Sequence, residues 1–172
     1  MEVFELNRDK AVNSLLYVVN KLKNPDVHKV LKILYFAEKE HLKEYGLPIF
    51  GDTYLKMKNG PVASFLKYVI DEKEKAGEYK GIVKRKGKHG IIASKEADKD
   101  YLSVSEKRCL DKAILENKNK SFSELKEKSH DSAYNKSKWN ISHLSVAEAS
   151  GMSADMLEFT KEQMLNMSLK LK

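Results

Sequence analysis

The feature that most constrains this chain is a broad apolar stripe on one face of residues 25–45. The apolar positions are Val27, Val30, Leu31, Leu34, Tyr35, Leu42 and Tyr45. Their spacing of three and four residues is the period of one helix face. Asn24-Pro25 suits the helix start, as a cap followed by the first helical residue, and Gly46 suits its left-handed end. A stripe this wide on a helix of about 20 residues predicts the central core element.

Polar residues divide around this stripe. Glu38 and His41 continue it, whereas four lysines fall mostly on the other faces, namely Lys29, Lys32, Lys39 and Lys43. A polar pair on an apolar stripe must form hydrogen bonds or it destabilises the fold. We therefore expect Glu38 and His41 to be buried and hydrogen-bonded, and the lysines to face solvent.

Helices are predicted on both sides of this element. One covers residues 9–22, and another follows Asn59-Gly60-Pro61 and buries Val62, Phe65, Leu66, Val69 and Ile70. Residues 54–58 form a candidate strand. Residues 78–94 predict a β-hairpin around the tip Gly87-Lys88-His89-Gly90.

Three Ser-x-x-Glu patterns follow, and each is typical of a helix capping box. They are Ser103/Glu106, Ser121/Glu124 and Ser145/Glu148, and they predict helices near 104–117, 122–128 and 146–149. Residues 130–143 read as an irregular segment around Trp139, and a last helix covers 154–167. The predicted fold class is therefore mostly α (α+β): a single compact helical domain over 1–172 with one small β-hairpin.

Composition limits the environment and the partners. The single cysteine, Cys109, permits no intramolecular disulfide, and it shares an apolar helix face with Leu110 and Ala113, which predicts a buried, inert thiol. No signal peptide and no run of about 20 apolar residues is visible. We expect a cytoplasmic protein without a membrane partner. The net charge of +7 favours acidic partners.

No motif indicates catalysis or a cofactor. Glu38/His41 and Glu127/His130 are Glu-x-x-His pairs, which di-iron helical bundles use together with two further glutamates. No carboxylates are spaced to complete such a set, and no His or Cys has zinc spacing. We therefore expect no metal, no cofactor and no catalytic residues.

Two surfaces are candidates for partner contact. Residues 80–95 carry six Lys or Arg and no acid up to Lys95, among them Lys84, Arg85, Lys86 and Lys88. A β-ribbon of this kind can contact nucleic acid, and lysines also keep an edge hairpin soluble. The last helix concentrates methionines, including Met156 and Met164, which suit either an adaptable surface or a core.

The central stretch resembles the Panacea domain family of SocA-like antitoxins. The matching residues are Leu34-Tyr35-Phe36-Ala37, His41-Leu42, Tyr45-Gly46, Pro48-Ile49, Gly51-Asp52-Thr53-Tyr54, Met57, Gly60-Pro61-Val62, Tyr68, Ser129-His130-Asp131-Ser132-Ala133-Tyr134 and Trp139-Asn140. The resemblance implies one mostly helical domain that binds and neutralises a cognate bacterial or phage toxin, with no enzyme activity or cofactor. Delivery of the toxin to a protease or chaperone is a further implied route.

On this interpretation the shared residues hold the scaffold. We expect Glu38, His41, Asp52 and His130 to form one polar cluster between the central helix, the connector after it and the irregular segment. The hairpin residues Lys84, Arg85, Lys86 and Lys88, together with Met156 and Met164, would then face the partner. The alternative function is a nucleic-acid-binding regulator that uses the basic hairpin 80–95.

Overall fold

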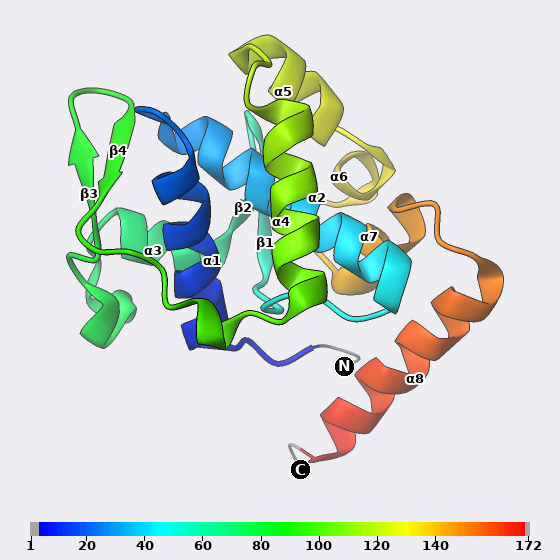
Figure 1. Ribbon diagram of the computed structural model, residues 1–172. Helices are drawn as coiled ribbons and strands as arrows, with labels where there is room; N and C mark the ends of the chain where they lie inside the picture. Colours follow the sequence, from blue (N-terminus) through cyan, green and yellow to red (C-terminus); the bar gives the residue numbers. More distant parts are fainter. Residues whose placement is uncertain (1–3, 171–172) are drawn as a thin grey trace.

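Helix α2 (Val27–Tyr45) runs through the middle of the structure, a computed structural model that describes residues 4–170 (Figure 1). Helices α1, α4, α5, α7 and α8 and strand β2 all contact it. Its residues Ile33, Leu34, Tyr35 and Ala37 are fully buried. The predicted central core element is therefore confirmed, and so is the mostly α (α+β) fold class. The single domain over 1–172 stays a prediction.

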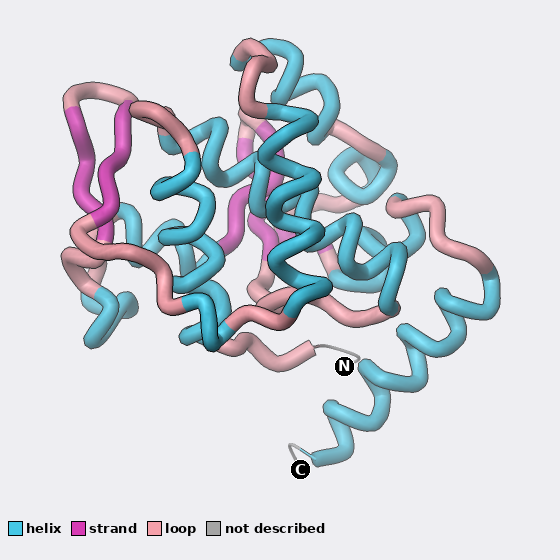
Figure 2. Tube along the Cα trace, viewed as in Figure 1, coloured by secondary structure: helices cyan, strands magenta, loops and turns pink. Residues whose placement is uncertain are grey.

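The chain consists mostly of helices, between which short strands occur. The helices are α1 (Arg8–Lys21), α2, α3 (Ser64–Ile70), α4 (Val104–Asn117), α5 (Phe122–Ser129), α6 (Ser132–Lys136), α7 (His143–Ala149) and α8 (Ala154–Lys170), with short 3-10 helices at Glu74–Tyr79 and Lys99–Tyr101. The strands are β1 (Tyr54–Met57), β2 (Gly60–Ala63), β3 (Val83–Lys86), β4 (Gly90–Ala93) and β5 (Asn140–Ile141). Figure 2 shows that helices outweigh strands throughout.

The start of α2 differs from the prediction. Asp26, not Asn24, caps the helix, and its side chain accepts a hydrogen bond from the Lys29 N–H at 2.7 Å. Pro25 lies outside the helix because its carbonyl accepts from the Ile91 N–H of β4 at 3.0 Å. A tertiary contact thus moves the helix start by two residues. The predicted end is confirmed, since Gly46 has φ +68° and its N–H bonds to Leu42 O.

A small sheet lies where the sequence suggested a strand at 54–58, a turn after it and an irregular segment, and β1 confirms the predicted strand. β1 pairs antiparallel with both β2 and β5, in the order β2-β1-β5. Lys58 and Asn59 form the turn between β1 and β2. Gly60 and Pro61 belong to β2, so the prediction that Gly60-Pro61 opens a helix is wrong, and α3 begins only at Ser64. Pro61 is tolerated because β2 is an edge strand. The segment 130–143 holds α6 and β5.

The other local signals gave mixed results. The hairpin β3–β4 is confirmed, as are the capping boxes of α4 and α5, in which both reciprocal bonds are present. The third predicted capping box, Ser145/Glu148, is wrong, because Ser142 caps α7 and its side chain accepts a hydrogen bond from the Ser145 N–H. Ser145 is therefore inside the helix.

The core extends from α1 through α2 to α4 and the small sheet. Cys109 is buried in it, as predicted, and burial raises the pKa of its thiol to about 11. Helix α8, orange to red in Figure 1, reaches from α7 past the end of α2. None of the helices described between residues 4 and 170 is both apolar enough and long enough to span a bilayer.

Candidate partner-binding site and its framework

Glu38 fixes the connector that follows α2. Its buried carboxylate accepts hydrogen bonds from the backbone N–H groups of Ile49, Phe50 (3.3 Å) and Gly51 (3.1 Å). Burial raises the pKa of Glu38 to about 7, while the three N–H donors act in the opposite direction. Because its partners are backbone groups of one turn, Glu38 holds that turn against the helix.

Asp52 caps a helix from a distance. Ala63, at the start of α3, has no side chain that could cap, and the carboxylate of Asp52 accepts from the N–H groups of Phe65 (2.8 Å) and Leu66 (3.2 Å) instead. These are first-turn donors that would otherwise lack partners. Burial raises the pKa of Asp52 to about 6, again against the effect of its N–H donors.

The two histidines make other contacts. His41 Nδ1 donates to Leu47 O at 2.7 Å, and its Nε2 lies 3.2 Å from Ser105 Oγ. The His130 ring stacks on Tyr134 with centroids 4.0 Å apart. Glu38 and Asp52 are near enough for the charge on Asp52 to raise the pKa of Glu38. Glu38 and His41 both bond to the connector after α2, and Asp52 bonds to α3. No hydrogen bond within residues 4–170 joins any two of the four residues expected in one cluster, and their scaffold role stays a prediction.

Asp131 is a third carboxylate, beside Glu38 and Asp52, that holds separate segments of the chain together, and these three residues are called the framework. No sequence pattern singled out Asp131. Its carboxylate accepts from Tyr35 Oη at 2.8 Å and Lys39 Nζ at 2.7 Å, both on α2, and also from the Tyr134 N–H at 3.1 Å, which caps α6. One carboxylate therefore joins two helices that are far apart in the sequence. The only available signal was its place in the Ser129–Tyr134 segment.

Lys32 contradicts the expectation that the lysines of α2 face solvent. It is 1% exposed, and its Nζ donates to Pro61 O at 2.5 Å. Burial lowers the pKa of Lys32 to about 7. Gly60 makes room for the side chain: at φ +109°, a Cβ there would lie 2.8 Å from Lys32 Cε and 2.3 Å from Ser129 Oγ. A glycine at the start of β2 thus permits a buried lysine.

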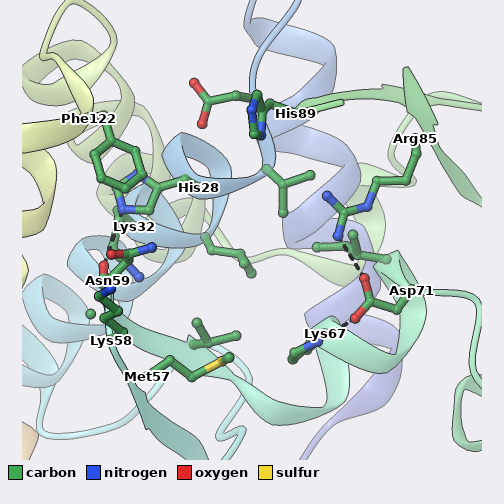
Figure 3. A pocket seen from close by; sticks show the side chains of 16 residues that line it. His28, Lys32, Met57, Lys58, Asn59, Lys67, Asp71, Arg85, His89 and Phe122 are labelled. Carbon is green, nitrogen blue, oxygen red and sulfur yellow. Dashed lines mark hydrogen bonds and ion pairs between the residues drawn. The ribbon is translucent and has the colours of Figure 1, made fainter. Parts of the chain in front are cut away.

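A pocket of about 730 Å³ opens beside Lys32 (Figure 3). Apolar side chains of α2, β2 and α3 line it, namely Val27, Leu31, Val62 and Ile70. Met57 and Phe122 also line it while remaining 40% and 50% exposed. Its size and apolar lining are those of typical ligand pockets.

The charged residues of the pocket are mostly basic. Lys32, Lys58, Lys67 and Arg85 line it against Asp26 and Asp71. Asp71 is shared between Arg85, at 2.7 Å, and Lys67, while Asp26 caps α2. Figure 3 places Phe122 and His28 on one side and Arg85, Asp71 and Lys67 on the other.

The remaining predicted partner residues fall into different environments. Lys84 and Lys88 are exposed, and Lys86 Nζ donates to Asn24 Oδ1 at 3.2 Å. Met164 is fully buried, so it packs in the core and does not face a partner, which corrects that prediction. Met156 is half-buried, and its Sδ lies 2.9 Å from where a Cβ on Gly46 would be.

Across residues 4–170, no three His, Cys, Asp or Glu side chains are grouped as ligands of a metal ion.

Comparison with known proteins identifies the family. A model of the family described as "Antitoxin SocA-like, Panacea domain" matches residues 30–140. No curated protein and no solved structure matches the chain. Because the family model spans well over half of the sequence, from α2 to β5, the chain belongs to the SocA-like antitoxin family with a Panacea domain.

Proposed function

We propose that this protein is an antitoxin that neutralises a toxin protein by binding it directly. The observation that carries the proposal is the family match over residues 30–140. That span contains Glu38, Asp52 and Asp131, whose carboxylates bond to other parts of the same chain. We therefore expect the toxin to bind the surface around these three residues.

The framework suits a binding protein because its segments are already ordered, so little conformational entropy is lost when a partner binds. Its connector, the start of α3 and the start of α6 are each held by a carboxylate that accepts at least two hydrogen bonds. A surface that is ordered before binding loses less conformational entropy on association than a mobile one. The net charge of +7 favours an acidic toxin surface and fast encounter with it.

Growth rescue tests the proposal. The chain is co-expressed in bacteria with a panel of small toxic proteins, one at a time, and compared with a version in which a stop codon replaces Lys10. We expect rescue from at least one toxin only when the protein is made, and co-elution of the two purified proteins in size-exclusion chromatography. Rescue by the stop-codon version, or rescue without a complex, contradicts direct neutralisation.

The same cells test delivery to a protease. If the protein presents the toxin for degradation, toxin abundance falls on co-expression and recovers in a host that lacks the responsible protease. Unchanged toxin abundance together with growth rescue supports neutralisation by binding alone.

The nucleic-acid alternative is tested by salt. A protein that neutralises phosphates with lysines loses affinity steeply as salt rises. In the hairpin, Arg85 bonds to Asp71 and Lys86 to Asn24, whereas Lys84 and Lys88 are exposed. Salt-sensitive binding to duplex DNA or RNA that disappears on changing Lys84 and Lys88 to Gln would favour the regulator instead.

A further inference from the structure

We infer that the pocket between α2, α3, the β1–β2 turn and α5 receives an acidic and apolar segment of the toxin: one large apolar side chain next to a carboxylate. This inference rests on the proposed function and names the site and the partner chemistry. Three features of the pocket support it: the apolar lining, the exposed rim and the charges.

The apolar lining provides the space for a side chain. Val27, Leu31, Val62 and Ile70 contribute to a volume of about 730 Å³. Such a volume exceeds the needs of one aromatic side chain, which leaves room for its neighbours in a bound segment. An apolar group that enters gains about 25 cal/mol for each Å² of apolar surface removed from water.

The rim exposes apolar surface that the fold itself does not use. Phe122 is 50% exposed although it is the first residue of α5, and its ring stacks on His28 with centroids 4.0 Å apart. Met57 is 40% exposed at the end of β1. Aromatic and methionine side chains of this kind are enriched at protein interfaces, so the rim is suited to contact a partner.

The basic residues of the pocket favour a bound segment in which an acidic residue is next to the large apolar side chain. Arg85 and Lys67 share the single carboxylate of Asp71, and Lys58 adds another cation. In Figure 3 Arg85 and Lys67 lie across the pocket from Phe122 and His28, whereas Lys58 lies on the side of His28. A segment whose apolar side chain contacts Phe122 therefore places an adjacent carboxylate toward Arg85.

Two variants and two matched controls test the assignment. Phe122→Ala removes the aromatic wall, and Arg85→Gln removes the cation opposite. Tyr101→Ala changes an aromatic residue that is 45% exposed and does not line the pocket. Arg108→Gln changes an arginine that, like Arg85, pairs with a carboxylate, here Glu44, and that does not line the pocket. Thermal unfolding of all four variants establishes that they fold.

The first measurement uses a small aromatic anion, 8-anilinonaphthalene-1-sulfonate, titrated into each folded protein and followed by fluorescence. We expect saturable binding that falls about tenfold in Phe122→Ala and Arg85→Gln, equivalent to a lost contact of ordinary hot-spot strength. Both controls should bind the anion as the wild type does. Equal binding by all five proteins overturns the pocket as an anion site.

The second measurement uses a toxin found by growth rescue. We expect this toxin to displace the fluorescent anion, and the two pocket variants to bind the toxin at least about tenfold more weakly than the controls. If the wild type neutralises a toxin that the pocket variants bind equally well, the pocket inference is wrong and the proposed function stands. If the wild type neutralises no toxin, the proposed function fails and this partner fails with it. Anion binding without any effect on the toxin assigns the pocket to a small molecule and overturns the toxin segment.

Discussion

Helix α2 carries two buried charged side chains that the fold treats in opposite ways. Glu38 and Lys32 are each 1% exposed. Glu38 accepts three backbone hydrogen bonds and thereby fixes the connector. Lys32 donates one, to Pro61 O, and no carboxylate bonds to it in the structure of residues 4–170. Glu38 therefore has three hydrogen-bond donors within the chain, whereas Lys32 has one acceptor.

The difference separates a region built for stability from one available for binding. Around Glu38, backbone N–H groups of the connector bond to its own carboxylate, and those at the start of α3 bond to the carboxylate of Asp52. Beside Lys32, the pocket keeps exposed apolar side chains and more cations than anions. A buried ion without a partner charge costs stability. Removal of the buried carboxylate in the first region should therefore destabilise the protein, whereas removal of the buried charge of Lys32 in the second should spare or even help its stability.

The largest expected effect is at Glu38. Glu38→Ala leaves three buried N–H groups without an acceptor, at about 1–3 kcal/mol each, so we expect a loss of about 5 kcal/mol in the free energy of unfolding. Urea denaturation measures it. Glu38→Gln should cost less, because its side-chain oxygen still accepts at one of the two positions.

Glu40→Ala is the matched control for this change. Glu40 is on the same helix but forms a surface ion pair with Lys112, which is worth less than about 1 kcal/mol. If Glu38→Ala costs no more than Glu40→Ala, the connector does not depend on Glu38 and the comparison between the two regions fails.

Lys32→Met should stabilise the protein near neutral pH. The pKa of Lys32 is about 7 in the folded protein against 10.5 for an ordinary lysine, so the unfolded chain binds the proton more tightly. The contribution of Lys32 to wild-type stability therefore rises with pH between about 7 and 10.5 and is lowest at and below pH 7. Methionine avoids this penalty, which is at most about 5 kcal/mol, but loses the bond to Pro61, worth about 1 kcal/mol.

We therefore expect Lys32→Met to gain up to about 4 kcal/mol at pH 6.5, a gain that shrinks as the pH approaches 10. Urea denaturation across this pH range measures it. Lys29→Met is the control, because Lys29 Nζ bonds to Lys118 O at the surface. A Lys32→Met protein that is less stable than the wild type at pH 6.5 would show that the lysine is compensated after all.

The sequence predicts one of these charged residues well and the other badly. Glu38 lies on the apolar stripe of α2, so its burial follows from helical periodicity. Lys32 was expected on a solvent face, and it is buried because the β1–β2 turn folds over it. The helix start at Asp26 differs from the prediction for the same reason, since β4 pairs with Pro25 there.

Local signals specified much of the fold, and contacts between distant segments specified the framework. The capping box of Ser103 and Glu106 and the left-handed Gly46 involve neighbouring residues, so the sequence shows them directly. Asp131 bonds to Tyr35 across 96 positions, and no periodicity records such a pair. The pocket likewise combines α2, α3, β3 and α5, which only the folded chain brings together.

Gly60→Ala sharpens the comparison at the turn over Lys32. A methyl group there meets Ser129 Oγ and Lys32 Cε, in a backbone conformation that disfavours side chains. We expect a loss of about 2 kcal/mol, combining strain and overpacking. Gly87→Ala is the matched control, because Gly87 has φ +63° and no atom within 4 Å of the added Cβ. Equal losses in both variants, measured by urea denaturation, would mean that only the backbone strain matters.

The smallest expected effect is in the hairpin. Lys84 and Lys88 are exposed and have no ion pair within residues 4–170, so the double change to Gln should alter the free energy of unfolding by less than about 0.5 kcal/mol. Arg85→Gln should cost slightly more, because Arg85 pairs with Asp71, although half exposure limits that pair to about 1 kcal/mol or less. Thermal unfolding at low and high salt measures both. A loss above 1 kcal/mol for the double variant would show that the hairpin cations stabilise the fold itself. The hairpin would then belong with the framework that stabilises the fold and not with the surface available for binding.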